Sequence, residues 1–214
     1  MLKLFHSPGA CSLVTHIALE EAGADYQPVR VTLAEGEHLK PEYLAINPHA
    51  RVPALATGKG TITENIAILN YIADRFGSAG SVPRGDAFAA AKCNELLGWF
   101  SSTVHITFAL IWRTGRFSDD QSIHPQIQQH GRNILVSQFD EIEGTCGNGW
   151  LVSDRFSAAD SYVLTFFRWG RRIGMDMKAY PKWADLNQRL LAEPSVQRAV
   201  EREGLGTELF QPAD

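Results

Sequence analysis

The sequence predicts two domains of different class, an α/β domain followed by an all-helical domain. Residues 1–77 alternate strand and helix patterns in the order β-α-β-α-β-β-α. Residues 78–86 are small, polar and rich in glycine, as expected of a linker. Residues 87–214 carry helical periodicity throughout. These three observations predict an α/β N-terminal domain joined by a short linker to an all-α C-terminal domain.

Each element of the first domain follows from a local pattern. The apolar run at 2–6 predicts a strand, and apolar residues at helical spacing that stop at Gly23 predict a helix after it. Alternation over 27–33 predicts a half-buried strand. The remaining elements are a short helix before Pro48, a hairpin around 58–60 and an amphipathic helix over 65–76.

The second domain is predicted from apolar residues that recur every three or four positions. One long helix is expected to bury Leu97, Phe100, Val104, Phe108 and Ile111 on a single face. Further helices are expected over 124–144, over 157–174, after Pro181 and after Pro194. Ser157 and Asp160 precede an apolar run with the spacing of a capping box, and we expect them to start a core helix without taking part in chemistry.

Composition excludes several classes of protein. The chain has 214 residues and a formal net charge of −4, which argues against nucleic acid or an anionic membrane as the main partner. We see no signal peptide and no apolar run long enough to span a bilayer. The three cysteines lack CxxC spacing, so neither a disulfide framework nor a metal site is expected. A cytoplasmic protein with reduced thiols is predicted.

Cys11 is the first candidate for chemistry, because it directly precedes the first predicted helix. The unpaired N–H groups of a helix N-terminus favour a thiolate, either that of the cysteine itself or that of a bound ligand. Cysteine is also a small apolar residue that packs well in cores. Position alone does not decide between a reactive and a structural Cys11.

Two further motifs lie at the edges of predicted strands. A cis bond between Val52 and Pro53 would turn the Val52 backbone outward to pair with an extended peptide, although a trans proline on an edge strand is the commoner arrangement. Asn65 could cap the following helix or help to hold a carboxylate at its N-terminus. Glu64 could accept hydrogen bonds from a ligand ammonium, or simply be an acid near a helix start.

Helical positions in the second domain supply further candidates. His105 lies inside the long helix, and a catalytic role is expected only if its helix face meets Cys11. An apolar pocket could be lined by Phe108, Trp112, Phe117 and Trp169, although core packing is expected for at least half of them. Arg113 and Arg116 could contact an anion, but a solvated helix end is the simpler interpretation.

In combination these features resemble a glutathione transferase over essentially the whole chain. The motifs SPGACSL, LAINPHARVPAL, TENIAILNYIAD and FSAADSY occur in the order and spacing of that family. The resemblance implies a thioredoxin-like N-terminal domain, a helical domain that contributes the apolar substrate pocket, and a homodimer. The cysteine in SPGACSL and the histidine in SSTVH are similar to those of the bacterial beta class.

The resemblance also implies roles for particular residues. Cys11 would lie beside the glutathione sulfur, with Ser12 as a further donor and His105 approaching from the second domain. Val52 would pair with the cysteinyl part of glutathione, with Pro53 cis. The implied glutathione-binding residues are Ala10, His38, Lys40, Arg51, Val52, Pro53, Glu64 and Asn65. His38 and Lys40 stand in for the basic residue that usually holds the glycyl carboxylate, which this sequence lacks.

Some positions depart from the family pattern. Asn65 replaces a common serine or glycine, Gly98 replaces a polar side chain, and Ile106 replaces a lysine of the beta class. Three functions are therefore compared. The first is conjugation of glutathione, as co-substrate and without a metal, to small apolar electrophiles, as in detoxification. The second is glutathione-dependent disulfide exchange through Cys11. The third is a non-catalytic binding or regulatory protein of the same fold.

Overall fold

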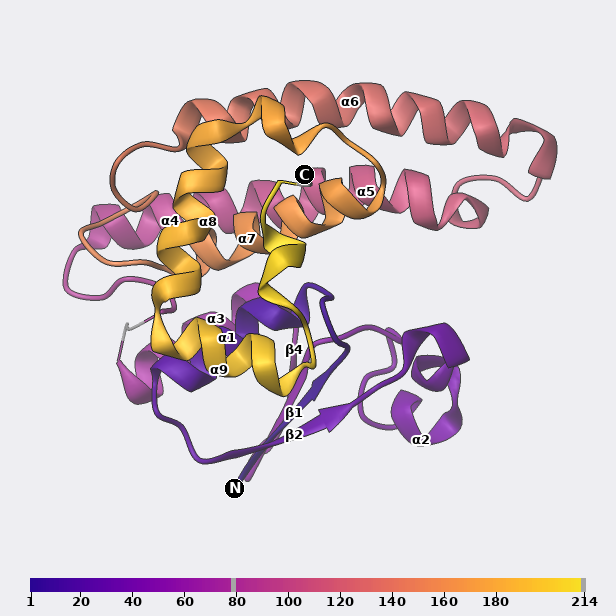
Figure 1. Ribbon diagram of the computed structural model, residues 1–214. Coiled ribbons are helices and arrows are strands. Elements are labelled where there is room, and N and C mark those ends of the chain that lie inside the picture. Colours follow the sequence, from indigo (N-terminus) through magenta and orange to yellow (C-terminus); the bar gives the residue numbers. More distant parts are fainter. Residues whose placement is uncertain (78–79, 213–214) are drawn as a thin grey trace.

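The computed structural model describes residues 1–77 and 80–212 and contains an α/β domain packed against a helical domain (Figure 1). The strands are β1 (Leu2–His6), β2 (Tyr26–Arg30), β3 (Ala54–Thr57) and β4 (Gly60–Thr63). They form one sheet in the order β2-β1-β3-β4, in which β1 is parallel to β2 and antiparallel to β3. This mixed sheet and its helices confirm the predicted thioredoxin-like class for the first domain.

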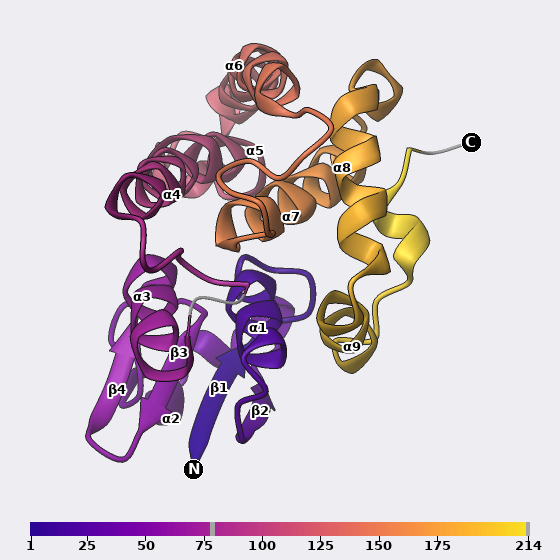
Figure 2. The same cartoon turned by 90° about the vertical axis from the view of Figure 1, so that its left-hand side faces the viewer.

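Helices cover both faces of this sheet. On one face lie α1 (Ser12–Glu21) and α3 (Asn65–Phe76), between the sheet and the helical domain (Figure 2). The short helix α2 (Pro41–Leu44) covers the other face, where Tyr43 packs on Phe5 with ring centroids 6.0 Å apart. The strand alternation in β1 explains the split, since Leu4 joins the main core and Phe5 the smaller one.

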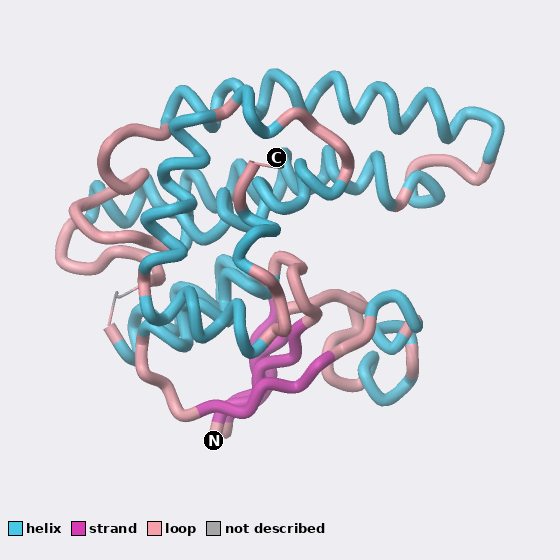
Figure 3. The backbone as a smooth tube through the Cα atoms, in the orientation of Figure 1, coloured by secondary structure: helices cyan, strands magenta, loops and turns pink. Residues whose placement is uncertain are grey.

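The helical domain is built around a buried central helix, α7 (Ala158–Arg172). A continuous helical rod contains α4 (Ala87–Trp99), a π-helical turn (Phe100–Val104) and α5 (His105–Trp112). The other helices are α6 (His124–Thr145), α8 (Pro181–Ala192) and α9 (Pro194–Arg202). Strands are confined to the N-terminal part of the chain that the structure describes, and helices make up most of the rest (Figure 3).

The last helix returns to the first domain. Helix α9 lies beside α1, although the two are far apart in the sequence (Figure 1). Glu20 of α1 pairs with Arg198 and Arg202 of α9 at N–O distances of 2.9 Å each. The N-terminal domain is therefore held by the C-terminal end of the chain as well as by the segment that joins α3 to α4.

Most predicted elements are confirmed, with small differences in their ends. Strand β2 stops at Arg30 instead of continuing to Leu33, because Arg30 pairs with His6, the last residue of β1. The five residues predicted to share one face of the long helix are all buried. Asn65 is the first residue of α3 and not its cap, since neither it nor Glu64 makes a side-chain capping hydrogen bond.

The predicted linker falls between α3 and α4. Residues 78–79 lie outside the described residues, and 80–86 contain no helix or strand. This segment is packed, since Val82 is fully buried and the Ser81 hydroxyl donates to the Leu69 carbonyl at 2.6 Å. The exact division into domains stays a prediction.

The capping box at the start of α7 is confirmed. The Asp160 carboxylate accepts hydrogen bonds from the Ser157 N–H at 2.8 Å and the Ser157 hydroxyl at 2.9 Å, and Ser157 caps the helix in return. Asp160 also accepts from the Leu151 N–H at 2.9 Å, so the cap anchors the preceding loop. All three polar contacts are made inside the core of the second domain.

We predict that Ser157→Ala lowers the free energy of unfolding by about 1–2 kcal/mol, because it removes a helix cap and one partner of the buried Asp160. Urea denaturation followed by circular dichroism measures the loss. Ser137→Ala on the exposed face of α6 is the matched control and should change stability by less than about 0.5 kcal/mol. Equal effects in the two variants would contradict the capping role.

Candidate functional site

A cavity of about 750 Å³ lies between the two domains. Its walls come from the β1–α1 loop, the segment before β3, the start of α3, one face of α5 and the C-terminal half of α7. Cys11 and His105 both line it, although they belong to different domains. The helix face that carries His105 therefore meets the cavity that also contains Cys11.

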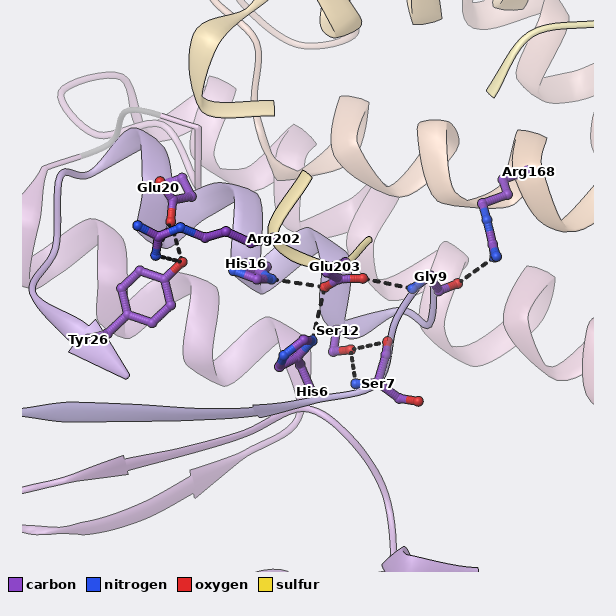
Figure 4. Close-up of polar contacts among 10 residues, drawn as sticks. All are labelled: His6, Ser7, Gly9, Ser12, His16, Glu20, Tyr26, Arg168, Arg202 and Glu203. Atoms are coloured by element: carbon purple, nitrogen blue, oxygen red, sulfur yellow. Dashed lines mark hydrogen bonds and ion pairs between the residues drawn. The ribbon is translucent and has the colours of Figure 1, made fainter. Parts of the chain in front are cut away.

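The β1–α1 loop is held from two sides through the peptide groups of Gly9. Its N–H donates to Oε2 of Glu203 at 2.7 Å, and its carbonyl accepts from Trp169 Nε1 at 2.8 Å and Arg168 Nη1 at 3.1 Å. Figure 4 shows Gly9 between Glu203 and Arg168. Gly9 has φ +66°, which favours glycine, and a Cβ there would displace the Arg168 guanidinium that binds the Gly9 carbonyl.

Glu203, just after α9, is a buried carboxylate with several hydrogen-bond donors. His16 Nδ1 lies 2.9 Å and His6 Nδ1 3.2 Å from its Oε1 atom (Figure 4). Burial alone would raise the pKa of Glu203, but the hydrogen bonds from His16 and the Gly9 N–H, together with the nearby His6 ring, outweigh it and hold this pKa below its usual range. A charged Glu203 thus fixes the loop that leads to Cys11.

His6, His16 and Glu203 are also of types that bind metal ions, and one ligand atom from each lies within 4.8 Å of the others. Both carboxylate oxygens of Glu203 already accept hydrogen bonds from the protein. These hydrogen bonds account for the position of Glu203 as a support for the Gly9 loop.

Cys11 precedes α1 and its thiol is mostly covered. Only 8% of the residue is exposed, and Sγ lies 3.4 Å from the Val52 carbonyl, to which it donates. Burial raises the pKa of Cys11 to about 12, more than the opposing charge of Arg113 lowers it. This desolvation opposes a thiolate on Cys11 itself and leaves a bound ligand's thiolate as the one that the helix N-terminus would favour.

Ser12 does not line the cavity, which corrects its expected place beside the sulfur. Its hydroxyl accepts from the Ser7 N–H at 3.1 Å and donates to the Ser7 carbonyl at 3.3 Å (Figure 4). The residue is fully buried. Ser12 therefore stabilises the turn of the loop. Of the two neighbouring residues, only Cys11 lines the cavity.

Asn65 lines the cavity, but its side chain is used inside the protein. Its amide donates to the Cys11 carbonyl at 2.9 Å and to the Tyr162 hydroxyl at 3.1 Å. Its oxygen accepts from Thr15 Oγ1 at 2.7 Å. The carboxamide thus ties α3 to the Cys11 loop and to α7, and leaves the backbone N–H at the start of α3 as the group that could meet a ligand.

The other two motifs of the first domain also reach the cavity. The bond between Val52 and Pro53 is cis, as the family resemblance implied, and both residues line the cavity. Glu64 lines it from an exposed position with φ +70°, a conformation that residues other than glycine seldom adopt. Such outliers are concentrated at binding sites, where surrounding structure holds them in place.

His105 follows the π-helical turn that separates α4 from α5. Such turns are frequent at functional sites because they change the face that the following helix presents. The His105 ring meets Trp169 edge to face at a centroid distance of 4.9 Å. Burial, assisted by the charges of Arg113, Arg51 and Arg116, lowers the pKa of His105 to about 4, so the ring is neutral near pH 7.

Besides Ser12, four predicted site residues lie outside the lining of this cavity: His38, Lys40, Phe108 and Phe117. Phe108 is fully buried and stacks beneath Trp112 at 5.3 Å, so it belongs to the core. Phe117 is 45% exposed on the surface. Trp112 and Trp169 do line the cavity, as do Ala10 and Arg51.

Arginines form a larger part of the cavity wall than the sequence indicated. Arg113 and Arg116 line it, so an anion contact stays a prediction beside the solvated helix end, and Arg116 is exposed to solvent. Arg30 and Arg172 line it as well and were missed. No local pattern marks Arg30, which ends a strand, or Arg172, which lies in the last turn of a helix; only the fold brings them together.

Comparisons with known proteins agree with this architecture. Residues 1–74 match the family model of the glutathione S-transferase N-terminal domain, and residues 121–194 match that of the C-terminal domain. The glutathione S-transferase GST-4.5 of Xanthomonas campestris is 31% identical over 95% of this chain and 100% of its own.

Solved structures are similar over nearly the whole chain. A glutathione transferase homologue from Sulfitobacter with bound glutathione has a TM-score of 0.88 and 36% identity, covering 96% of this chain and 99% of its own. A beta-class enzyme from Sphingomonas chungbukensis has a TM-score of 0.77 and 35% identity, covering 95% and 100%. The chain belongs to the glutathione S-transferase family of enzymes.

Within residues 1–77 and 80–212, no helix combines the length and the apolar character needed to cross a membrane.

We predict that Glu203→Gln lowers the free energy of unfolding at pH 7 by about 2–4 kcal/mol, because a buried carboxylate that accepts from Gly9 and His16 becomes a neutral amide. A carboxyl group whose pKa is lower in the folded state stabilises that state at pH values above its unfolded-state pKa. This stabilisation is lost as the pH falls through the folded-state pKa. The difference between wild type and variant should therefore shrink below about pH 4. Urea denaturation across this range measures it, and a constant difference would contradict the charged state of Glu203.

We also predict that the native protein reacts slowly with iodoacetamide at pH 8. Burial raises the pKa of Cys93 to about 11 and that of Cys146 to about 12, as it does for Cys11. Since the thiolate is the reactive form, each thiol should react at least about 100-fold more slowly than in urea. Intact-mass spectrometry counts the adducts, and rapid labelling of Cys11 alone would show that it is a thiolate.

Proposed function

We propose that the protein conjugates glutathione to small electrophiles in the cavity between its domains. The observation that carries this proposal is that Cys11, Val52, Glu64 and His105, which are far apart in the sequence, line one cavity. A volume of about 750 Å³ suits a tripeptide together with a small second substrate. The glutathione-bound Sulfitobacter relative, which spans the same length of chain, supports the choice of tripeptide.

Backbone and side-chain groups of the first domain would hold glutathione. The N–H groups at the start of α3 would bind the γ-glutamyl carboxylate, with the Asn65 backbone in place of its occupied side chain. Glu64 would accept from the ammonium group. Val52 would pair with the cysteinyl backbone as an added strand does.

The glycyl carboxylate would be bound by Arg51 and Arg30. Both line the cavity, whereas His38 and Lys40 do not. A guanidinium can hold a carboxylate through two parallel hydrogen bonds. This assignment supplies the basic group that the family pattern places elsewhere and that the sequence lacks there.

The glutathione sulfur would lie beside Cys11 and His105. With its raised pKa, Cys11 keeps its proton near pH 7 and would turn its S–H from the Val52 carbonyl to donate to the glutathione thiolate. His105 is neutral and could donate one ring N–H. Arg113 is the cation that most strongly opposes the raised pKa of Cys11, so its positive charge would also favour a thiolate next to Cys11.

Conjugation then needs only correct placement of the second substrate. The thiolate attacks the electrophilic carbon, a sulfur–carbon bond forms, and the leaving group departs with its electron pair. Trp112, Trp169 and Ile106 provide apolar surface for the body of the electrophile. We further propose a cytoplasmic homodimer that acts in detoxification, as the family resemblance implies.

The alternatives make different demands on Cys11. Disulfide exchange needs a Cys11 thiolate, which the raised pKa opposes in the free protein. A binding or regulatory protein would retain glutathione affinity without turnover. Substitution of the thiol separates all three functions.

We predict that Cys11→Ala lowers kcat/KM for chlorodinitrobenzene about tenfold and that Cys11→Ser retains more activity, because serine can still donate to the thiolate. Loss is partial because the helix terminus and Arg113 remain. Cys146→Ala, which removes a thiol outside the cavity lining, is the matched control. Isothermal titration calorimetry confirms that each variant still binds glutathione.

The same variants test the alternatives. Unchanged conjugation in Cys11→Ala together with complete loss of glutathione-dependent reduction of hydroxyethyl disulfide would show that both chemistries run in one cavity and that only disulfide exchange depends on Cys11. Glutathione binding with no turnover of either compound by the wild type would favour the non-catalytic protein.

A further inference from the structure

The cavity contains more positive charge than glutathione requires. Five arginines line it: Arg30, Arg51, Arg113, Arg116 and Arg172. Within the described residues, none of the five makes a side-chain hydrogen bond or an ion pair. Glu64 is the single carboxylate among the described lining residues. Arginines outside the cavity do form ion pairs; for example, Arg84 Nε lies 2.8 Å from the Asp74 carboxylate.

Glutathione can neutralise only part of this charge. As a thiolate it brings two carboxylates, one sulfur anion and one ammonium, and the ammonium is assigned to Glu64. The α3 N-terminus takes one carboxylate, Arg30 and Arg51 the other, and Arg113 faces the sulfur. Arg116 and Arg172 are left without a partner in the glutathione complex.

These two arginines border an apolar shelf on the second domain, formed by Ile106, Trp112 and Trp169. Arg116 lies in the turn Thr114–Arg116 directly after α5, and the Arg172 guanidinium lies 5.7 Å from the centroid of the Trp112 ring. Trp112 is 40% exposed and Ile106 41%, so the shelf is open to a ligand. An aromatic surface edged by guanidinium groups is suited to an aromatic anion.

We propose that the preferred second substrates of this enzyme are aromatic electrophiles that carry a carboxylate, bound with the ring on the Trp112 shelf and the carboxylate at Arg116 and Arg172. This inference rests on the proposed conjugation of glutathione in the same cavity. It replaces the expectation of a purely apolar electrophile with an anionic substrate class.

Within the part of the chain that the structure describes, neither Arg116 nor Arg172 is paired with a carboxylate; both side chains are exposed, and the Arg172 guanidinium lies over the Trp112 ring. Arg171, next to Arg172, already hydrogen-bonds to the carbonyls of Glu208 and Gln211 near the end of α7. Burial and the neighbouring charges of Arg113 and Arg51 lower the pKa of Arg116. Unpaired like charges repel one another, and a bound carboxylate would relieve this repulsion.

The carboxylate takes no part in the chemical step. In a chloronitrobenzoate, the glutathione sulfur forms a bond to the ring carbon, the carbon–chlorine bond breaks, and chloride leaves with the electron pair. The carboxylate only binds and orients the ring, so its contribution should appear in kcat/KM relative to a neutral analogue.

The test compares a chloronitrobenzoate with the benzamide of the same ring substitution, each rate being divided by its uncatalysed rate with glutathione. We expect the wild type to favour the benzoate about tenfold or more, and Arg116→Gln and Arg172→Gln each to lower this preference about three- to tenfold. Arg84→Gln, at an exposed ion pair outside the cavity lining, should leave the preference unchanged. Added salt should lower the benzoate preference of the wild type.

Equal or better use of the benzamide by the wild type would overturn the inference, as would a preference that neither arginine substitution alters. Failure of the proposed function is distinguishable from this result. In that case neither electrophile is conjugated, and chlorodinitrobenzene is not conjugated either. Calorimetry with glutathione shows whether the arginine variants still bind the co-substrate. A lost preference for the benzoate can then be distinguished from a loss of glutathione binding.

Discussion

The arrangement of the site depends on the hydrogen bonds to the Gly9 peptide groups. The N–H side is bound by Glu203 after the last helix, and the carbonyl side by Trp169 and Arg168 of the central helix. Three segments that are distant in the sequence therefore meet at one loop. Because a buried carboxylate tolerates little displacement from its donors, this loop holds Cys11 at a constant position relative to the second domain.

Burial, and not the helix dipole, determines the state of Cys11. A cysteine at a helix start is expected to be acidic, but this thiol is covered and donates to the Val52 carbonyl. The cost of desolvating a thiolate exceeds the benefit of the helix terminus and of Arg113. In the proposed complex, the same thiol would be a protonated donor beside the glutathione sulfur, which would lie in a cavity lined by cationic side chains.

The charge of the cavity links the two domains chemically. Arginines from the first domain and from the second line the same space, so the cavity carries a field that favours anions, which the proposed binding of glutathione would use. The net charge of the whole chain is −4, and nothing in that total indicates a local excess of positive charge. The local excess of positive charge therefore arises from the distribution of charge over the fold and not from its sum.

Local sequence patterns determined the order of the elements, the two-domain class and the capping box at Ser157, because helix and strand periodicity and capping chemistry act over a few residues. The motifs around Cys11, Val52 and Glu64 were recognisable for the same reason. Only the tertiary structure decided which side chains share a cavity. It turned Ser12 and the Asn65 carboxamide inward, placed Phe108 in the core, excluded His38 and Lys40, and brought Arg30 and Arg172 together with Arg113 and Arg116. Burial and long-range proximity decide these outcomes, and both arise only when distant segments pack against one another.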